Sequence, residues 1–218
     1  MPNILLINPN SSQATTDMMV RIAQADAPAG FTVVGITASG GPSMIVNEAE
    51  LAAAAVEVER AWRSADVPHA GVIIGAFGDP GIDQVRALSG ATPVVGICEA
   101  SMLEAAEGGR RFGVATVTPD LVDAIDAKAR QLGLGELYTG VQLTPGDPRA
   151  LAAEPRVLED ALAMATQECL DDGAQAVIIG GGPLGQAAVS LARRFDMPLV
   201  APISAAVRRL GRQLAVSA

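Results

Sequence analysis

Two segments of the chain, 105 positions apart, share one pattern, and this repeat leaves few folds open. The first is VIIGAFGDPG at positions 72–81, and the second is VIIGGGPL at positions 177–184. Each is a run of β-branched apolar residues that ends in a glycine-rich turn, as expected of a buried strand followed by a loop. The same spacing continues beyond these strands, because PVV at 93–95 is matched by PLV at 198–200. We therefore predict a duplicated chain with two similar lobes.

Apolar strand patterns alternate with helical patterns along the whole chain. The strands are expected near residues 4–7, 31–37, 72–74, 93–98, 138–143 and 199–202, with others beginning at 112 and 177. The helices are expected near residues 14–25, 48–64, 82–88, 121–132, 156–172 and 186–195, with a closing helix to about 216. This alternation predicts an α/β fold with parallel sheets flanked by helices. We place one lobe at residues 1–97 plus 204–218 and the other at residues 98–203.

The charge and the apolar content of the chain exclude several kinds of partner. The formal net charge is −9, and no cluster of lysines or arginines could follow a phosphate backbone, so we expect no nucleic acid partner. The chain begins without a basic segment and has no apolar run of membrane-spanning length, so we expect a cytoplasmic protein without a membrane partner. Cys98 and Cys169 are then expected to be reduced thiols.

Four loops are expected to meet in a cleft between the lobes, because ligands bind beyond the carboxyl ends of parallel strands. These loops cover residues 8–12, 76–81, 116–119 and 181–184. They offer amide groups, hydroxyl groups and backbone N–H groups, which suit a carboxylate or an enolate. The residues expected to bind substrate are Asn8, Asn10, Ser11, Ser12, Phe77, Gly78, Thr116, Val117, Thr118, Gly181, Gly182 and Pro183.

Two acidic residues near these loops are candidate catalytic bases. Asp79 or Glu99, if buried beside an apolar pocket, could have a raised pKa and remove a proton. The alternative is structural: Asp79 would cap the helix that follows Pro80 and Gly81, and Glu99 would hold a loop by accepting backbone N–H bonds. The sequence has no metal-ligand spacing, no P-loop lysine and no dinucleotide fingerprint, so we expect no metal and no cofactor.

Several motifs, in order along nearly the whole chain, resemble one known family. They are INPNSS at 7–12, GP at 41–42 with Ile45, FGDPG at 77–81 and GICEA at 96–100. Together they are similar to the aspartate/glutamate/hydantoin racemase superfamily, and most similar to its hydantoin and allantoin racemase branch. The resemblance implies a cofactor-independent, homo-oligomeric enzyme with two pseudo-symmetric lobes and a small anionic or cyclic-amide substrate. It also implies that a cysteine from each lobe flanks the substrate, one removing the α-proton and the other supplying one.

The chain departs from this pattern at both cysteine positions. Matched to the family motifs, these positions fall on Ala76 and Gly181, which are also partners in the internal repeat. Neither side chain can carry a proton. The replacement is either engineered or natural, and the smooth GGGP run at 180–183 favours natural divergence. Cys98 is either a relocated thiol or a buried structural cysteine, and its apolar surroundings favour the second.

Three functions are consistent with the sequence. The first is racemase-like chemistry at the carbon next to a carboxylate or carbonyl group. The second is a cysteine-free lyase, decarboxylase or hydrolase on the same scaffold, in which Asp79 or Glu99 could activate water. The third is a non-catalytic binding protein for small anions.

Overall fold

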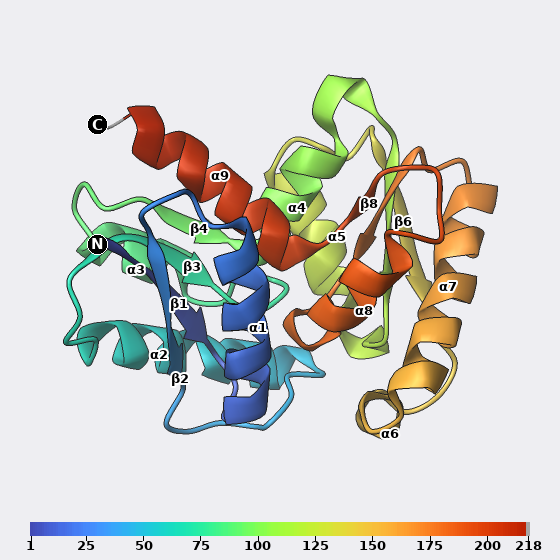
Figure 1. Cartoon of the computed structure of the whole chain (residues 1–218). Helices are drawn as coiled ribbons and strands as arrows, with labels where there is room; N and C mark the ends of the chain where they lie inside the picture. The colour runs from blue at the N-terminus through green and yellow to red at the C-terminus, as the bar shows by residue number, and fades with distance from the viewer. Residues whose placement is uncertain (217–218) are drawn as a thin grey trace.

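Strands and helices alternate along the chain in the computed structural model, which describes residues 1–216 (Figure 1). The strands are β1 (Asn3–Asn8), β2 (Thr32–Thr37), β3 (His69–Ile74), β4 (Val94–Gly96), β5 (Phe112–Thr116), β6 (Tyr138–Leu143), β7 (Ala176–Ile179) and β8 (Leu199–Val200). The α-helices are α1 (Gln13–Asp26), α2 (Glu48–Arg63), α3 (Ile82–Leu88), α4 (Ile97–Ala105), α5 (Val122–Gln131), α6 (Pro148–Ala152), α7 (Pro155–Asp171), α8 (Gly185–Leu191) and α9 (Pro202–Val216). Short 3-10 turns are η1 (Glu107–Gly109), η2 (Pro119–Leu121) and η3 (Gly182–Leu184). None of the described helices is both long and apolar enough to cross a membrane.

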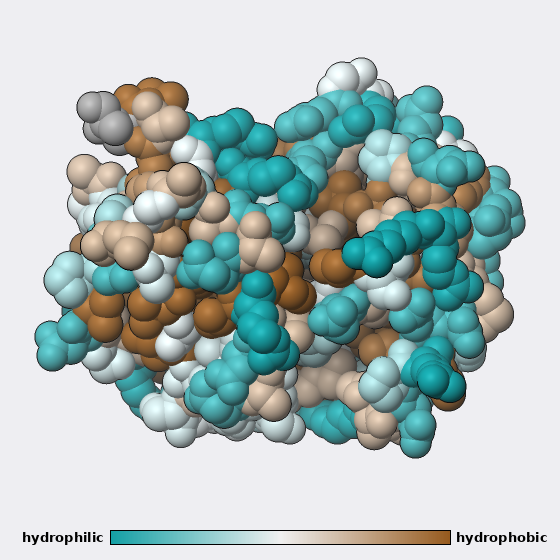
Figure 2. Space-filling view, viewed as in Figure 1, coloured by the Kyte–Doolittle hydropathy of each residue, from teal (hydrophilic) through white to brown (hydrophobic). Residues whose placement is uncertain are grey.

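The strands form two parallel sheets of four strands each, with the order β2-β1-β3-β4 in one and β6-β5-β7-β8 in the other. The central strands β1, β3, β5 and β7 are mostly apolar on both faces and are buried except at the first residues of β1 and β3, as in sheets covered by helices on both sides. The predicted α/β fold with two pseudo-symmetric lobes is thereby confirmed. Figure 2 shows partly exposed apolar surface around β2, which is an edge strand of the first sheet.

The two lobes repeat each other down to single hydrogen bonds. In the first lobe the Gly75 N–H donates to Ile7 O over 2.8 Å, just beyond the end of β3. In the second lobe the Gly180 N–H donates to Ala115 O over 2.9 Å, just beyond the end of β7. These bonds hold the loops that follow the two central strands in equivalent positions.

The last helix of each repeat packs against the other lobe. Helix α9 follows the last strand of the second sheet but packs on α1, β3 and β4 of the first lobe. Helix α4 follows the last strand of the first sheet but contacts α5, β7 and β8 of the second lobe, and it also packs on α9 (Figure 1). The lobe boundaries at 97/98 and 203/204 stay a proposal, which this packing supports.

Two expected strands are shorter than their sequence patterns predict, and the helix expected at 186–195 ends at Leu191. The strand expected at 199–202 is β8, which ends at Val200, and α9 begins at Pro202. The apolar run at 93–98 predicts a strand throughout, but β4 ends at Gly96 and α4 begins at Ile97. The N–H groups of the first turn of α4 have carboxylate acceptors, described below, and these favour a helix start at this point. The expected strand therefore gives way to a helix whose N-terminus lies at the carboxyl edge of the first sheet.

Candidate active site

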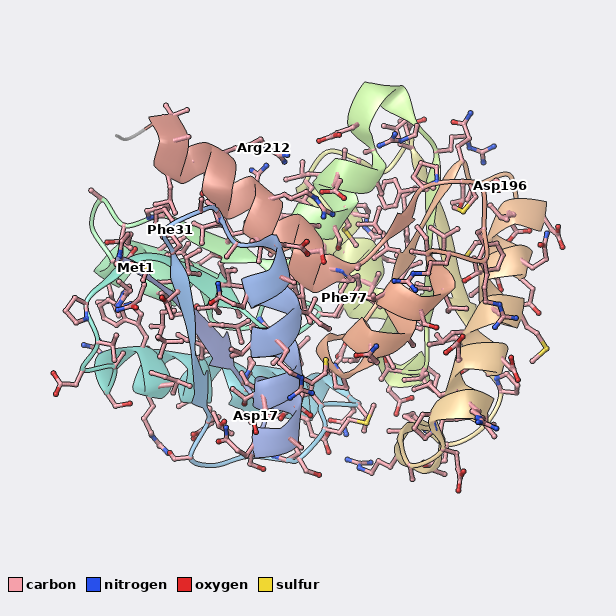
Figure 3. The ribbon with its side chains drawn as sticks, viewed as in Figure 1. Met1, Asp17, Phe31, Phe77, Asp196 and Arg212 are labelled. Atoms are coloured by element: carbon pink, nitrogen blue, oxygen red, sulfur yellow. The ribbon has the colours of Figure 1, made fainter. Side chains whose placement is uncertain are left out.

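A pocket lies between the lobes, at the carboxyl ends of the two sheets. It holds about 500 Å³ of space that no atom fills, part of it continuous with solvent. Its lining residues are Asn10, Met44, Ile45, Gly75, Ala76 and Phe77 from the first lobe, and Val117, Thr118, Leu121, Ile125, Gly180, Gly181, Gly182, Pro183 and Leu184 from the second. Figure 3 shows Phe77 where the two halves of the molecule meet. None of the lining residues has an ionisable side chain.

The structure separates the expected binding residues into two groups. Those that line the pocket are Asn10, Phe77, Val117, Thr118, Gly181, Gly182 and Pro183. Those that do not are Asn8, Ser11, Ser12, Gly78 and Thr116. Three residues of the second group, Asn8, Ser12 and Thr116, form hydrogen bonds with the lining residues Asn10 or Thr118.

Asn8 is fully buried and fixes Asn10 in the pocket wall. Its Nδ2 donates to Asn10 Oδ1 over 2.8 Å and to Thr16 Oγ1 over 3.0 Å, and its Oδ1 accepts the Asn10 N–H over 3.2 Å. Asn10 Oδ1 also accepts the Ser12 N–H over 2.9 Å, so the side-chain carbonyl of Asn10 is fully used. Its Nδ2 has no hydrogen-bond partner within residues 1–216, which leaves an N–H donor at the pocket.

Ser11 and Ser12 are structural. Ser12 Oγ accepts the Thr15 N–H over 3.3 Å and thereby caps α1, as its place before the helix predicts. Ser11 Oγ donates to Gly41 O over 3.1 Å and ties the β1–α1 loop to the β2–α2 loop. Neither residue lines the pocket.

Thr116 and Thr118 form the corresponding pair in the second lobe. Thr116 Oγ1 donates its single hydrogen to Gly180 O over 2.7 Å. Thr118 must therefore be the donor in the 3.3 Å contact between the two hydroxyl oxygens. Thr118 lines the pocket as Asn10 does, and its hydroxyl oxygen can still accept a hydrogen bond.

Ala76 and Gly181 lie in the pocket wall at equivalent positions of the two lobes. The backbone N–H groups of these two residues and of Phe77 and Gly182 find no acceptor among the described residues. Donors of this kind on both sides of one pocket suit a carboxylate or a developing enolate oxygen. Gly181 has a φ of 148° and a ψ of 135°, a conformation that only glycine adopts without strain.

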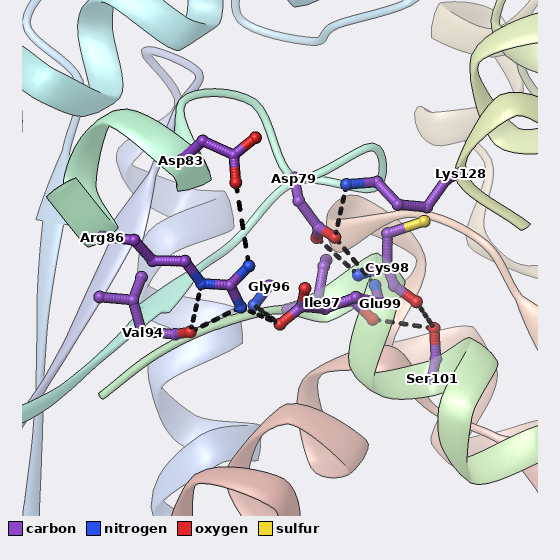
Figure 4. Close-up of polar contacts among 10 residues, drawn as sticks. All are labelled: Asp79, Asp83, Arg86, Val94, Gly96, Ile97, Cys98, Glu99, Ser101 and Lys128. Carbon is purple, nitrogen blue, oxygen red and sulfur yellow. Dashed lines mark hydrogen bonds and ion pairs between the residues drawn. The ribbon is translucent and has the colours of Figure 1, made fainter. Parts of the chain in front are cut away.

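Asp79 does not line the pocket and does not cap the helix that follows it. Its carboxylate accepts the N–H groups of Cys98 and Glu99, both over 2.8 Å, and so caps α4 instead of α3 (Figure 4). Lys128 Nζ lies 3.5 Å from Asp79 Oδ2. Burial raises the pKa of Asp79 to about 6, the charge of Lys128 lowers it and that of Glu99 raises it. The N-cap residue of α3 is Gly81, which has no side chain to accept a bond.

Glu99 also lies away from the pocket. Its Oε1 accepts a hydrogen bond from Arg86 Nη2 at 2.5 Å and one from the Gly96 N–H at 3.4 Å (Figure 4). A general base must lie within hydrogen-bond reach of the proton that it removes. The geometry therefore favours the structural roles of Glu99 and Asp79 over the catalytic ones.

The two thiols are buried and are poor nucleophiles. Burial and the nearby Asp79 carboxylate raise the pKa of Cys98 well above its ordinary value, although a hydrogen bond from the Gly78 N–H lowers it. Burial is also the main cause that raises the pKa of Cys169 to about 12. A thiol acts as a base or nucleophile in its thiolate form, so neither group takes the place of the missing pair. Within residues 1–216, no group of His, Cys, Asp and Glu side chains could hold a metal ion.

Sequence reasoning missed the apolar side of the pocket. Met44 and Ile45 come from the β2–α2 loop, and Leu121 and Ile125 come from η2 and α5. Met44 is buried among side chains of the second lobe, including Leu151. Apolar residues carry no chemical signal of a site, although Ile45 belongs to one of the motifs that carry the resemblance.

The duplicated α/β fold, with a pocket between equivalent loops of its two lobes, is the architecture of the two-lobed racemases, and comparison with known proteins places the chain among them. A family model described as Asp/Glu/Hydantoin racemase matches residues 4–210. The chain belongs to this family. It is similar to hydantoin racemase from Paenarthrobacter aurescens, with 30% identity over 210 residues that cover 94% of this chain and 88% of that protein.

Solved structures lead to the same family. Allantoin racemase from Klebsiella pneumoniae superposes with a TM-score of 0.88 at 28% identity, covering 100% of this chain and 89% of that one. Allantoin racemase from Pseudomonas fluorescens has the same fold, with a TM-score of 0.90 at 24% identity over 99% of this chain and 92% of that one. The resemblance seen in the sequence is thereby confirmed, and the relatives are isomerases by name.

Proposed function

We propose that the chain acts in the inter-lobe pocket on a small cyclic amide or carboxylate, at the carbon next to the carbonyl group. The observation that carries this proposal is that the backbone N–H groups of Ala76, Phe77, Gly181 and Gly182, four residues that line one pocket from two lobes, have no acceptor among the described residues. A cyclic amide as substrate is supported by the similarity of the chain to hydantoin and allantoin racemases. We take a 5-substituted hydantoin as the ligand class.

The pocket offers such a ligand two different environments. Backbone N–H groups and the Asn10 amide would bind the carbonyl oxygens, where negative charge grows as the α-proton leaves. The apolar side chains of Met44, Ile45 and Leu121 would hold the substituent at the α-carbon. Stabilising the enolate makes the α-proton more acidic, and this is the part of racemase chemistry that the chain retains.

Proton transfer by paired thiols is not part of this proposal, because the positions expected to carry them hold Ala76 and Gly181. We propose that the proton exchanges with solvent instead. A second candidate function, binding or bond cleavage without racemisation, is favoured by the absence of any ionisable side chain among the lining residues. We also retain the proposal of a homo-oligomer.

Proton NMR in D₂O distinguishes these functions. The protein is incubated with D- and L-5-benzylhydantoin, allantoin, L-aspartate, L-glutamate and phenylmalonate. We expect deuterium to enter the α-position of a hydantoin faster than in buffer alone. A new compound in the spectrum would assign a lyase or hydrolase instead. Saturation transfer to a ligand without exchange or product would assign a binding protein.

A further inference from the structure

Asp79 connects the pocket wall of the first lobe to helices that pack in the second. It follows Ala76 and Phe77, which line the pocket, by three and two positions. Its carboxylate binds the first turn of α4 and approaches Lys128 of α5 (Figure 4). Ile125, one turn before Lys128 on α5, lines the pocket from the other side. One carboxylate thus connects elements that form two walls of the same pocket.

The backbone at Asp79 is held in an unusual conformation. With a φ of 52°, it is the one non-glycine residue within 1–216 whose φ is positive. Such a conformation persists where its surroundings hold it, and it is frequent at functional sites. A side chain at position 96 would overlap the Asp79 carboxylate, so Gly96 leaves the space that this carboxylate fills. Both observations indicate that the carboxylate fixes the β3–α3 loop.

The charges around Asp79 single out Lys128 as its ionic partner. From α4, Glu99 also faces this carboxylate, but its own partner is Arg86 of α3. Cys98 of α4 has a raised pKa and is therefore neutral. The Lys128 side chain is 12% exposed and that of Asp79 is 0% exposed, so solvent screens this ion pair little.

We propose that the Asp79–Lys128 ion pair is a clamp between the lobes, which positions Ala76 and Phe77 against α5 and thereby sets the width of the pocket. Asp79 and Lys128 are then positioning residues for the chemistry of this pocket. The clamp needs an ionised carboxyl group. Because burial raises the pKa of Asp79 to about 6, the attraction between Asp79 and Lys128 is lost as the pH falls through this value, while protonation also removes the cost of burying the carboxylate charge.

Amide hydrogen exchange followed by mass spectrometry tests this clamp without any substrate. The wild-type chain and Lys128→Met are compared at about pH 7.5 and about pH 5.0, with rates corrected for intrinsic exchange. At the higher pH we expect the peptides that cover residues 75–81 and 122–131 to exchange roughly tenfold faster in Lys128→Met. At the lower pH we expect the two proteins to exchange alike, because Asp79 is protonated in both.

Two further variants separate the ion pair from general packing. Lys128→Arg keeps the positive charge, and we expect it to retain protection at the higher pH. Arg149→Met removes the exposed pair between Arg149 and Glu50, which also joins the two lobes, and we expect no pH-dependent change at residues 75–81. Equal exchange of wild type and Lys128→Met at the higher pH, or an equal acceleration at both pH values, would overturn the proposal. Because no ligand is used, either result is independent of the reaction that the pocket performs.

Discussion

Ala76 and Gly181 line one pocket from opposite lobes, each two residues beyond the end of an equivalent strand, β3 or β7. Their backbones differ, because Gly181 has a φ of 148° whereas Ala76 does not have a positive φ. The two residues are therefore equivalent in position but differ in backbone conformation. The two positions should respond differently to the same substitution.

Ala76→Cys should give the pocket a proton acceptor. Ala76 is 8% exposed and its φ is not positive, so we expect the fold to accept a thiol there. A positioned acid or base commonly adds about 10²- to 10⁴-fold to a proton transfer, and we expect at least the lower value for α-deuterium incorporation into 5-benzylhydantoin. The measurement is proton NMR in D₂O, with Ala76→Ser as control. An unchanged rate in a variant that binds the hydantoin normally would contradict this expectation.

Gly181→Ala should destabilise the fold. The backbone conformation at this position is strained for any residue with a Cβ, and the new Cβ would lie 3.1 Å from Leu184 Cγ. We expect a loss of about 1 to 3 kcal/mol in the free energy of unfolding, measured by urea denaturation. Ala76→Cys, at the equivalent position, should cost less. Equal stability of Gly181→Ala and the wild type would mean that the loop readily changes its backbone.

Asn10→Asp should weaken binding while the fold is retained. The replacement keeps the oxygen that accepts bonds from Asn8 and Ser12 and exchanges the free N–H donor for a second carboxylate oxygen. We expect the affinity for an anionic ligand such as phenylmalonate to fall more than about tenfold, because like charges repel in a poorly solvated pocket.

Asn8→Ala is the structural counterpart of Asn10→Asp: it leaves buried groups unpaired and should cost about 1 to 3 kcal/mol of stability. Isothermal titration and thermal unfolding separate the two effects, and an Asn10→Asp variant with unchanged affinity would remove Asn10 from the binding site.

Asp79 should make the folded chain less stable at neutral pH than at acidic pH. Its pKa in the folded chain is raised from 3.8 to about 6, so the unfolded chain loses this proton first as the pH rises. The stabilising contribution is fully present below about pH 3.8 and is lost as the pH rises through about 6. The difference corresponds to about 3 kcal/mol. Urea unfolding of wild type and Asp79→Asn at several pH values should show this slope in the wild type alone, and parallel curves would contradict it.

The fold could be predicted from the sequence because apolar strand patterns alternate with helical patterns, and two of the strands recur 105 positions later. The end of β4 could not be predicted, because its run of apolar residues continues to Cys98 while the helix start depends on Asp79, which is distant in the chain. A local pattern cannot reveal a cap that comes from another loop.

The sequence predicts which loops form the candidate site but not which of their side chains line the pocket. Asn8 and Asn10 look alike in sequence, and only packing shows that one is buried support and the other lines the pocket. Asp79 looked like a cap for the helix next to it, whereas the positive φ at this residue turns its carboxylate toward α4. Which neighbour a polar group meets is decided by tertiary structure.

The central claim is that the inter-lobe pocket binds a small cyclic amide through backbone N–H groups of both lobes. Titration of ¹⁵N-labelled protein with 5-benzylhydantoin, followed by two-dimensional ¹H–¹⁵N NMR, tests it most directly. We expect saturable shifts of the Ala76, Phe77, Gly181 and Gly182 amides and of the Asn10 side-chain amide. Shifts confined to other parts of the chain, or none at millimolar ligand, would contradict the account.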